Sequence, residues 1–225
     1  MVNRESRTPS ALWASVWIVL FLLFAFLTAA VAMPYNLVVT ADQWFENLLL
    51  SVRTPLLIHI FDGITFLGNT LFVVGIAGVV GAFLLYSKVY KAYAIGLAGT
   101  LIMAATTGYA MKIMVARARP SGLIPSMIET SFSFPSGHAT AAMALYGFMA
   151  YLLCTLFPAK KPLILSAAIL IVGGIGFSRL YLGVHFPSDI IAGYLLGSLC
   201  LLIGIQIVNR LRDKEAAAPQ EALLH

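Results

Sequence analysis

Hydrophobic residues run along this chain in long blocks separated by short polar segments, and the length of the blocks predicts the fold. A helix needs about 20 mostly apolar residues to cross the hydrocarbon core of a bilayer. Blocks of about this length lie at residues 12–33, 70–87, 92–111, 138–157, 163–182 and 189–208. Because every backbone polar group in lipid must be paired inside the protein, such blocks favour helices. The pattern predicts an all-α fold, a six-span transmembrane helical bundle.

Three segments need a separate interpretation. Residues 35–69 mix polar residues into an apolar background, which is typical of an interfacial amphipathic helix and a loop that lead into the next span. Residues 213–225 are polar and predict a solvated tail. The first block, with Arg4 and Arg7 before it, resembles a signal peptide cut after Ala32. It is too long for a typical one, so we expect a retained anchor.

Composition excludes other classes of protein. Of the 225 residues, 60% are hydrophobic and 10% are charged, which is outside the range of ordinary soluble domains. We therefore expect one integral membrane domain over residues 1–225. The net charge of +5 does not indicate nucleic acid, because the basic residues stand in short runs between apolar blocks. Cys154 and Cys200 lie inside apolar blocks and are most simply small buried hydrophobes, with a disulfide as the less favoured alternative.

The distribution of basic residues predicts the orientation. Six crossings place the N-terminus, the segments between alternate spans and the C-terminus on one side. That side collects nine of the fourteen basic residues, namely Arg4, Arg7, Lys88, Lys91, Lys160, Lys161, Arg210, Arg212 and Lys214. By the positive-inside rule both termini are expected to be cytoplasmic. The other five basic residues then lie on the extracytoplasmic side.

The outer end of the third block reads KIMVARARP, from Lys112 to Pro120. Lys112 and Arg119 are seven residues apart, so on a continuous helix they project from the same face and can converge on one anion. Arg117 would be rotated off that face, and we interpret it as a headgroup contact or a loop charge. Pro120 is expected to stop the helix.

The fourth block opens with PSGH, from Pro135 to His138. Pro135 suits the first position of a helix, so Ser136, Gly137 and His138 are expected in its first turn. There the backbone N–H groups have no intrahelical partner and the helix dipole favours negative charge. Gly137 would let a ligand approach the backbone closely. The segment therefore predicts an anion site.

A third polar segment reads FSRLYLGVHFPSD, from Phe177 to Asp189. Arg179 ends the fifth span, and Pro187 marks the start of the sixth, with His185 just ahead of it. Since four residues separate His185 from Asp189, the carboxylate can reach the imidazole, which would fix its tautomer and raise the basicity of the other nitrogen.

All three segments lie at the same side of the predicted bundle. Together they bring cations, helix N-termini and two histidines around one point, which predicts a pocket for a phosphate-like anion. A divalent metal is disfavoured, because three cations would repel it and only Asp189 would bring negative charge. Snorkelling toward lipid headgroups is the alternative for each cation taken alone.

Other polar residues are interpreted as structural or solvent-exposed. Four acidic residues could contact a substrate or order the outer loops, and solvated faces are the favoured interpretation for them: Asp42, Glu46, Asp62 and Glu129. His59 and His225 are assigned no role, and Ser178 is expected to give hydrogen-bond support. The stretch from Gly193 to Gly197 has the small-xxx-small spacing of close helix contact and is expected to pack inside the bundle.

The three segments together resemble the signature of the type 2 phosphatidic acid phosphatase superfamily, and the six-span layout is similar to its bacterial membrane lipid phosphatase branch. The resemblance implies a phosphatase of a bacterial-type plasma membrane that needs no metal or cofactor. It implies that His185 attacks phosphorus to give a phosphohistidine, that Asp189 orients His185, and that His138 protonates the leaving oxygen and then activates water. The residues it implies for holding the phosphoryl oxygens are Lys112, Arg119, Ser136, Gly137 and Arg179.

The substrates that the resemblance implies are lipid phosphates: phosphatidylglycerophosphate, phosphatidic acid, diacylglycerol pyrophosphate or undecaprenyl pyrophosphate. The residues do not choose among them, because lipid tails contact generic apolar surface. An anion or phospholipid transporter is the alternative from another class, since transporters also aim helix N-termini and basic residues at anionic cargo.

Overall fold

The computed structural model of the chain describes residues 10–33, 36–87, 90–121 and 129–221. Within these ranges the chain forms α-helices and a short 3₁₀ turn at Pro158–Lys160, without a strand. The helices are α1 (Ser10–Ala32), α2 (Leu37–Ser51), α3 (Pro55–Phe66), α4 (Thr70–Tyr86), α5 (Lys91–Val115), α6 (Gly137–Leu156), α7 (Lys161–Tyr181) and α8 (Pro187–Glu221). The all-α prediction is confirmed.

Six helical segments of the described chain are long and apolar enough to cross a membrane, judged by length and composition. They are Trp13–Ala32, Pro55–Tyr86, Lys91–Val115, Gly137–Leu156, Pro158–Tyr181 and Pro187–Ala217. Many of their large apolar side chains are exposed, as expected of surfaces that face lipid. The predicted blocks are all found, but the second apolar segment begins at Pro55 rather than near residue 70.

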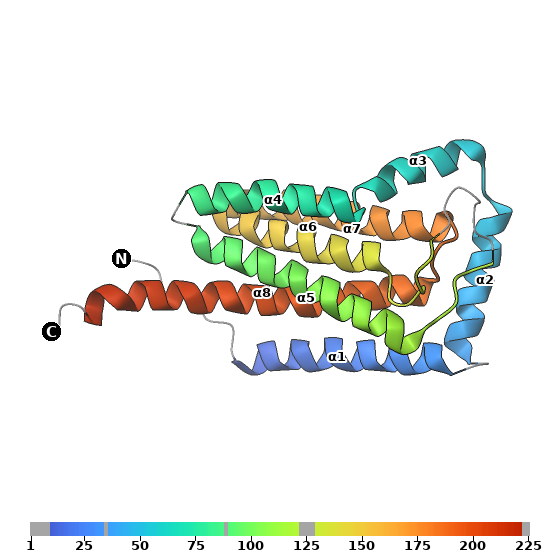
Figure 1. Cartoon of the computed structure of the whole chain (residues 1–225), viewed down its shortest axis with the longest axis horizontal. Helices are drawn as coiled ribbons and strands as arrows, with labels where there is room; N and C mark the ends of the chain where they lie inside the picture. Colours follow the sequence, from blue (N-terminus) through green and yellow to red (C-terminus); the bar gives the residue numbers. More distant parts are fainter. Residues whose placement is uncertain (1–9, 34–35, 88–89, 122–128, 222–225) are drawn as a thin grey trace.

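The segment predicted as an interfacial helix and loop, residues 35–69, contains two helices within its described residues 36–69 rather than one. The chain breaks after α2 because Thr54 caps a new helix: its hydroxyl oxygen accepts from the Leu57 N–H at 3.3 Å, and Pro55 takes the first position. In Figure 1, α2 crosses one end of the bundle, and α3 leads from it toward α4.

The remaining helices run roughly along the long axis of the molecule (Figure 1). The long helix α8 packs against α1, α5 and α6, while α7 packs against α6 and α3. The end of α5, the start of α6, the end of α7 and the start of α8 all lie at the end of the bundle that α2 crosses. The three polar segments singled out in the sequence follow or begin these helices, so the topology gathers them in one place.

Two glycines of α8 allow it to lie against α6. A methyl group at Gly193 would lie 2.8 Å from the Ser136 carbonyl oxygen, and one at Gly197 would lie 2.8 Å from the Thr140 carbonyl oxygen. These obstacles are backbone atoms, which cannot move away cheaply. The prediction that Gly193 to Gly197 serves internal packing is confirmed, and the contact holds the start of α6 beside the start of α8.

Helix α8 continues to Glu221, so the polar residues 213–221 are helical, and residues 213–217 are exposed, as expected of a solvated segment. Residues 222–225 lie outside the described residues. Neither cysteine forms a disulfide: Cys200 is buried, as expected, and Cys154 is half-buried.

The contact between α6 and α8 generates a first test. We expect Gly193→Ala to destabilise the protein by about 1–3 kcal/mol, the usual cost of overpacking a close contact. The measurement is thermal unfolding in detergent. Gly75→Ala on α4 is the matched control, because a methyl group there meets nothing within 4 Å. Equal melting temperatures for the two variants would contradict this account of the packing.

Candidate active site

Helix α5 ends earlier than its sequence predicts. The last helical residue is Val115, and Ala116 adopts a left-handed conformation with φ 48°. Lys112 therefore lies in the last helical turn, whereas Arg119 lies on the segment that follows. The prediction that a continuous helix presents Lys112 and Arg119 on one face is wrong, and Pro120 does not terminate this helix.

Lys112 and Arg119 nevertheless lie close together, because the chain after α5 folds back toward the end of that helix. After α5 the chain is held by the Ser133 N–H, which donates to the Arg117 carbonyl at 2.9 Å. This contact brings Phe132 back to the helix end. Its carbonyl oxygen accepts from Lys112 Nζ at 2.5 Å and from Arg119 Nη2 at 3.3 Å. Tertiary packing, rather than helical periodicity, places the two cations together.

Helix α6 begins at Gly137, two residues later than the start expected at Pro135. Ser136 is the N-cap, and its hydroxyl accepts from the Ala139 N–H at 3.5 Å, so Gly137 and His138 form the first turn. Ser136 is fully buried, and its own N–H donates to the Asp189 carbonyl at 3.0 Å. The N–H groups at Gly137 and His138 are the ones that a helix start leaves without intrahelical acceptors.

His185 and Asp189 make the contact that their spacing predicts. His185 Nδ1 lies 3.3 Å from Asp189 Oδ2. Since a carboxylate only accepts, Nδ1 carries the proton, and in the neutral ring Nε2 keeps its lone pair. Arg119 Nη1 lies 3.3 Å from that Nε2. Burial lowers the pKa of His185 to about 4, against the opposing effect of Asp189, so the ring is neutral at pH 7.

Glu129 sits among the cations, which overturns its interpretation as a solvated residue. Its carboxylate forms ion pairs with Arg119, at 2.5 Å, and with Arg179. Burial by itself would raise the pKa of Glu129, but the two guanidinium groups outweigh it and hold the pKa below its ordinary value. An ionised carboxylate therefore bridges two cations that were predicted to bind an anion.

Arg179 lies near the end of α7, as predicted, and is almost fully buried. Besides its pair with Glu129, it donates to Thr65 Oγ1 at 3.0 Å. Its Nε–H has no acceptor within the described part of the chain. Ser178 is fully buried and donates to the Ile175 carbonyl at 2.6 Å, a local bond on α7.

Arg117 does not contact headgroups or act as a free loop charge, so that interpretation is wrong. Its guanidinium donates to Asp189 at 2.6 Å, to Asp42 at 2.7 Å and to Ser188 Oγ at 2.7 Å. Asp42 is only 2% exposed, so its assignment to a solvated face is also wrong. The residues of this cluster come from α2, from the segment after α5 and from the first turn of α8.

Both histidines line one cavity of about 430 Å³. Its polar end contains Lys112, Glu129, Gly137, His138 and His185. Arg119 and Arg179 are joined to this end through Glu129, and Asp189 is joined to it through His185. The structure therefore brings Lys112, Arg119, His138, Arg179, His185 and Asp189 around a single point.

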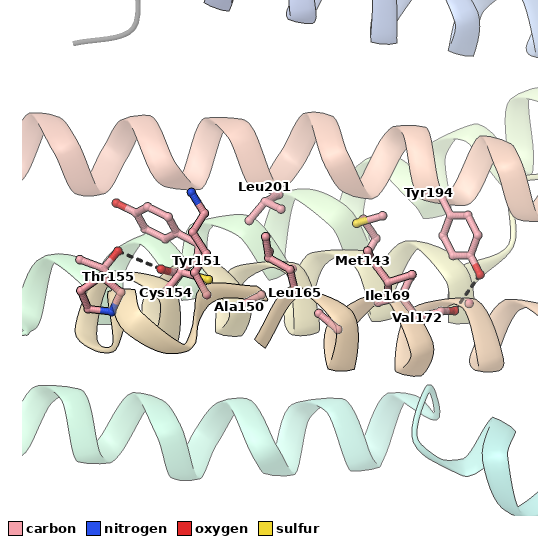
Figure 2. A pocket seen from close by; sticks show the side chains of 15 residues that line it. Met143, Ala150, Tyr151, Cys154, Thr155, Leu165, Ile169, Val172, Tyr194 and Leu201 are labelled. Atoms are coloured by element: carbon pink, nitrogen blue, oxygen red, sulfur yellow. Dashed lines mark hydrogen bonds between the residues drawn. The ribbon is translucent and has the colours of Figure 1, made fainter. Parts of the chain in front are cut away.

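A larger cavity, of about 900 Å³, lies between α6, α7 and α8 (Figure 2). Most of the side chains around it are apolar. Two of its polar groups are satisfied locally: Tyr194 donates to the Val172 carbonyl at 2.7 Å, and Thr155 donates to the Tyr151 carbonyl at 2.9 Å. None of the six converging residues lines it, so size alone does not mark the site.

The arrangement suits chemistry on a tetrahedral oxyanion. Three cations and the start of a helix favour negative charge at one point. A neutral imidazole faces the same point, and its Nε2 lone pair accepts from Arg119 at 3.3 Å. The sequence pattern favoured solvated faces for Glu129 and Asp42 and a headgroup contact or loop charge for Arg117, so it did not indicate their part in the site. One signal was present for Glu129, since it is an acidic residue predicted to lie on the same outer side as Lys112, Arg119 and Arg179.

Comparisons with known proteins agree with this geometry. The model of the PAP2 superfamily matches residues 92–213. Phosphatidylglycerophosphatase B of Bacillus subtilis is 34% identical over 191 residues, 82% of this chain and 90% of that protein. An undecaprenyl-diphosphatase of Sulfolobus acidocaldarius is 33% identical over 57% of this chain and 61% of its own length. The crystal structure of a transmembrane PAP2-type phosphatidylglycerolphosphate phosphatase from Bacillus subtilis superposes with a TM-score of 0.78 at 31% identity, covering 88% of this chain and 96% of that one.

The bridging carboxylate generates a second test. Because Glu129 occupies donors that an oxyanion would use, Glu129→Gln should strengthen the binding of vanadate about tenfold, a change of about 1.4 kcal/mol. The dissociation constant can be measured by calorimetry on the purified protein. Glu46→Gln on α2 removes the same charge away from the cavity and should leave binding unchanged. Unchanged or weaker binding by Glu129→Gln would show that the carboxylate does not compete with anions.

Proposed function

The chain belongs to the PAP2 superfamily and is a lipid phosphatase, and from this premise we propose that it hydrolyses the phosphate ester or pyrophosphate of a membrane lipid through a phosphohistidine at His185. The transporter alternative is set aside, because the relatives that match most of the chain are phosphatases.

One observation carries the choice of a lipid substrate: the cavity that contains the histidines is polar at one end and apolar along the rest. Its apolar walls come from α4, α5 and α6, and they include Val73, Val74, Leu101, Ala104 and Ala105. A phosphate headgroup would meet the cations while its hydrocarbon tail lay between these helices. A lipid could then enter sideways from the bilayer.

In the first chemical step, His185 Nε2 attacks phosphorus. A bond forms between nitrogen and phosphorus, the bond from phosphorus to the leaving oxygen breaks, and His138 gives that oxygen a proton. Nε2 keeps its lone pair because Asp189 holds the proton on Nδ1. The lone pair accepts from Arg119 at 3.3 Å and is released for attack when Arg119 turns to the phosphoryl oxygens. Burial that lowers the pKa of His185 to about 4 supports this role, since the ring is unprotonated at neutral pH.

In the second step, a water oxygen forms a bond to phosphorus, the bond from phosphorus to His185 Nε2 breaks, and His138 takes a proton from the water. Inorganic phosphate leaves, and His185 recovers its lone pair. Arg119, Arg179 and Lys112 neutralise the phosphoryl oxygens in both steps, with help from the N–H groups at the start of α6. Ser136 supports the same helix start as its N-cap rather than by direct contact. Glu129 must give up its guanidinium partners when the substrate binds.

A metal ion is not required by this scheme. The charge that a metal would neutralise is already met by three cationic side chains, and those side chains would repel a divalent cation. The substrate most strongly supported by the comparisons is phosphatidylglycerophosphate, since the bacterial relative of that activity matches most of the chain. Undecaprenyl pyrophosphate is the second candidate.

The positive-inside pattern supports an extracytoplasmic site. The start of α1 and the end of α8 lie toward the end of the bundle opposite the one that α2 crosses (Figure 1). The polar residues of the cavity lie at or between the helix ends on the α2 side. Since the start of α1 and the end of α8 belong to the more basic side, we place them in the cytoplasm of a bacterial-type cell. The cavity then opens on the outer side, as the sequence predicts.

The direct test is phosphate release by the purified protein from a panel of lipid phosphates with chelator present. We expect turnover without divalent cation, and His185→Ala should lower kcat by more than about 10³-fold while substrate binding is largely retained. His59→Ala on α3 is the matched control and should retain activity. A strict need for added metal, or full activity of His185→Ala, would contradict the mechanism.

A second test locates the lipid tail. Ala105→Trp on α5 places a large side chain in the apolar part of the polar cavity, so KM should rise about tenfold for a long-chain lipid phosphate and stay unchanged for a small aryl phosphate. Ala168→Trp on α7 makes the same change in the larger cavity and should affect neither substrate. If Ala168→Trp raised KM for the long-chain substrate and Ala105→Trp did not, the tail would lie between α6, α7 and α8.

A further inference from the structure

A chain of buried charged groups runs from His185 to the helix that crosses the end of the bundle. His185 contacts Asp189, Asp189 contacts Arg117, and Arg117 contacts Asp42 on α2. Of these residues, Arg117 and Asp42 do not line the cavity that contains the histidines. They cannot contact a substrate there, so any effect on catalysis must pass through Asp189.

The Asp189 carboxylate is held on both of its oxygens. Oδ2 faces the His185 ring and also accepts from the Phe186 N–H at 2.9 Å. Oδ1 accepts from Arg117 Nη1 at 2.6 Å. Without Arg117, a fully buried carboxylate would lose its ionic partner, which favours its rotation or protonation. Either change would release the proton on His185 Nδ1 from its fixed acceptor.

Arg117 is itself held from two directions. Asp42 accepts from its second terminal nitrogen, and the Phe186 ring lies under the guanidinium, with 4.3 Å between the guanidinium carbon and the ring centroid. A planar guanidinium can bond Asp189 and Asp42 at the same time, which the single ammonium of a lysine cannot do with the same geometry.

Asp42 fixes α2 to the first turn of α8. Its carboxylate accepts from the Ser188 backbone N–H at 3.0 Å and from the Ser188 hydroxyl at 2.5 Å, in addition to Arg117. A carboxylate at a helix N-terminus is favoured by the unpaired N–H groups and by the dipole. The helix that crosses the bundle is thus joined to the element that carries Asp189.

We propose that Arg117 and Asp42 are positioning residues that hold Asp189 in the orientation His185 needs, and that α2 is thereby a structural part of the active site. The inference rests on the proposed function for its catalytic consequence. Its geometric content, that Arg117 and Asp42 fix the His185–Asp189 contact, does not depend on which lipid is the substrate.

The experiment compares Arg117→Gln, Asp42→Asn and the double variant with the wild-type protein, using a small aryl phosphate. Each single variant should lower kcat about tenfold, the size seen when outer partners of a site are removed, with KM within about twofold. Because both residues act through the Asp189–His185 contact, the kcat of the double variant should be only slightly below that of the less active single variant. Glu46→Gln, one turn along α2, is the control and should match the wild-type protein.

A second readout does not need activity. In protein labelled with ¹⁵N at histidine, the Nδ1 proton signal of His185, assigned by its absence in His185→Gln, should shift or broaden in Arg117→Gln and Asp42→Asn and stay in place in Glu46→Gln. A purely structural attachment of α2 would lower the melting temperature without changing this signal or kcat.

Unchanged kcat and an unchanged His185 signal in both variants would overturn the inference. If Arg117→Gln does not fold, Asp42→Asn supplies the test, since its side chain keeps its volume. If the wild-type protein releases no phosphate, the proposed function fails, and the histidine signal still decides whether Arg117 and Asp42 fix the ring.

Discussion

Positive charge buried at one end of a helical bundle is the constraint on which the rest of this structure depends. Arg117, Arg119 and Arg179 all lie there with little solvent, and an unpaired charge in such surroundings is costly. Arg117 forms ion pairs with two fully or nearly buried carboxylates, those of Asp189 and Asp42, so this pairing is shielded from solvent. Arg119 and Arg179 share the one carboxylate of Glu129, which is 30% exposed and can be exchanged. The ion pairs of Arg117 stabilise the fold. The ion pairs with Glu129 leave Arg119 and Arg179 able to bind an entering oxyanion in its place.

The fold meets this constraint by bringing four helix ends together. The start of α6 supplies free N–H groups, and the start of α8 supplies the carboxylate that orients a histidine. They are locked to each other because the glycines of α8 let the backbones approach, so that the Ser136 N–H reaches the Asp189 carbonyl. Such backbone contacts tolerate little displacement, which is what a site that works mainly by positioning and charge requires.

The bilayer explains why the same cavity is both polar and apolar. Its walls continue the lipid-facing surfaces of α4 and α5, where large apolar side chains would be unfavourable in water. Its polar end needs the charges that a bilayer excludes, and these are tolerated only because they are paired within the protein. Under the proposed function, selection of a substrate would act at the headgroup, and the tail would contribute affinity with little discrimination.

The sequence by itself determined the features that depend on local pattern. The length of the apolar blocks predicted the spans, and the four-residue spacing predicted that Asp189 reaches His185, because both follow from helix geometry. Only the tertiary structure decided that α5 ends at Val115, that residues 35–69 form two helices, and that Arg117, Asp42 and Glu129 take part in the site. Arg117 meets partners 75 and 72 positions away in the chain, and Asp42 meets Ser188 at a separation of 146. Which charges become paired over such separations depends on how helices pack, and no local periodicity encodes it.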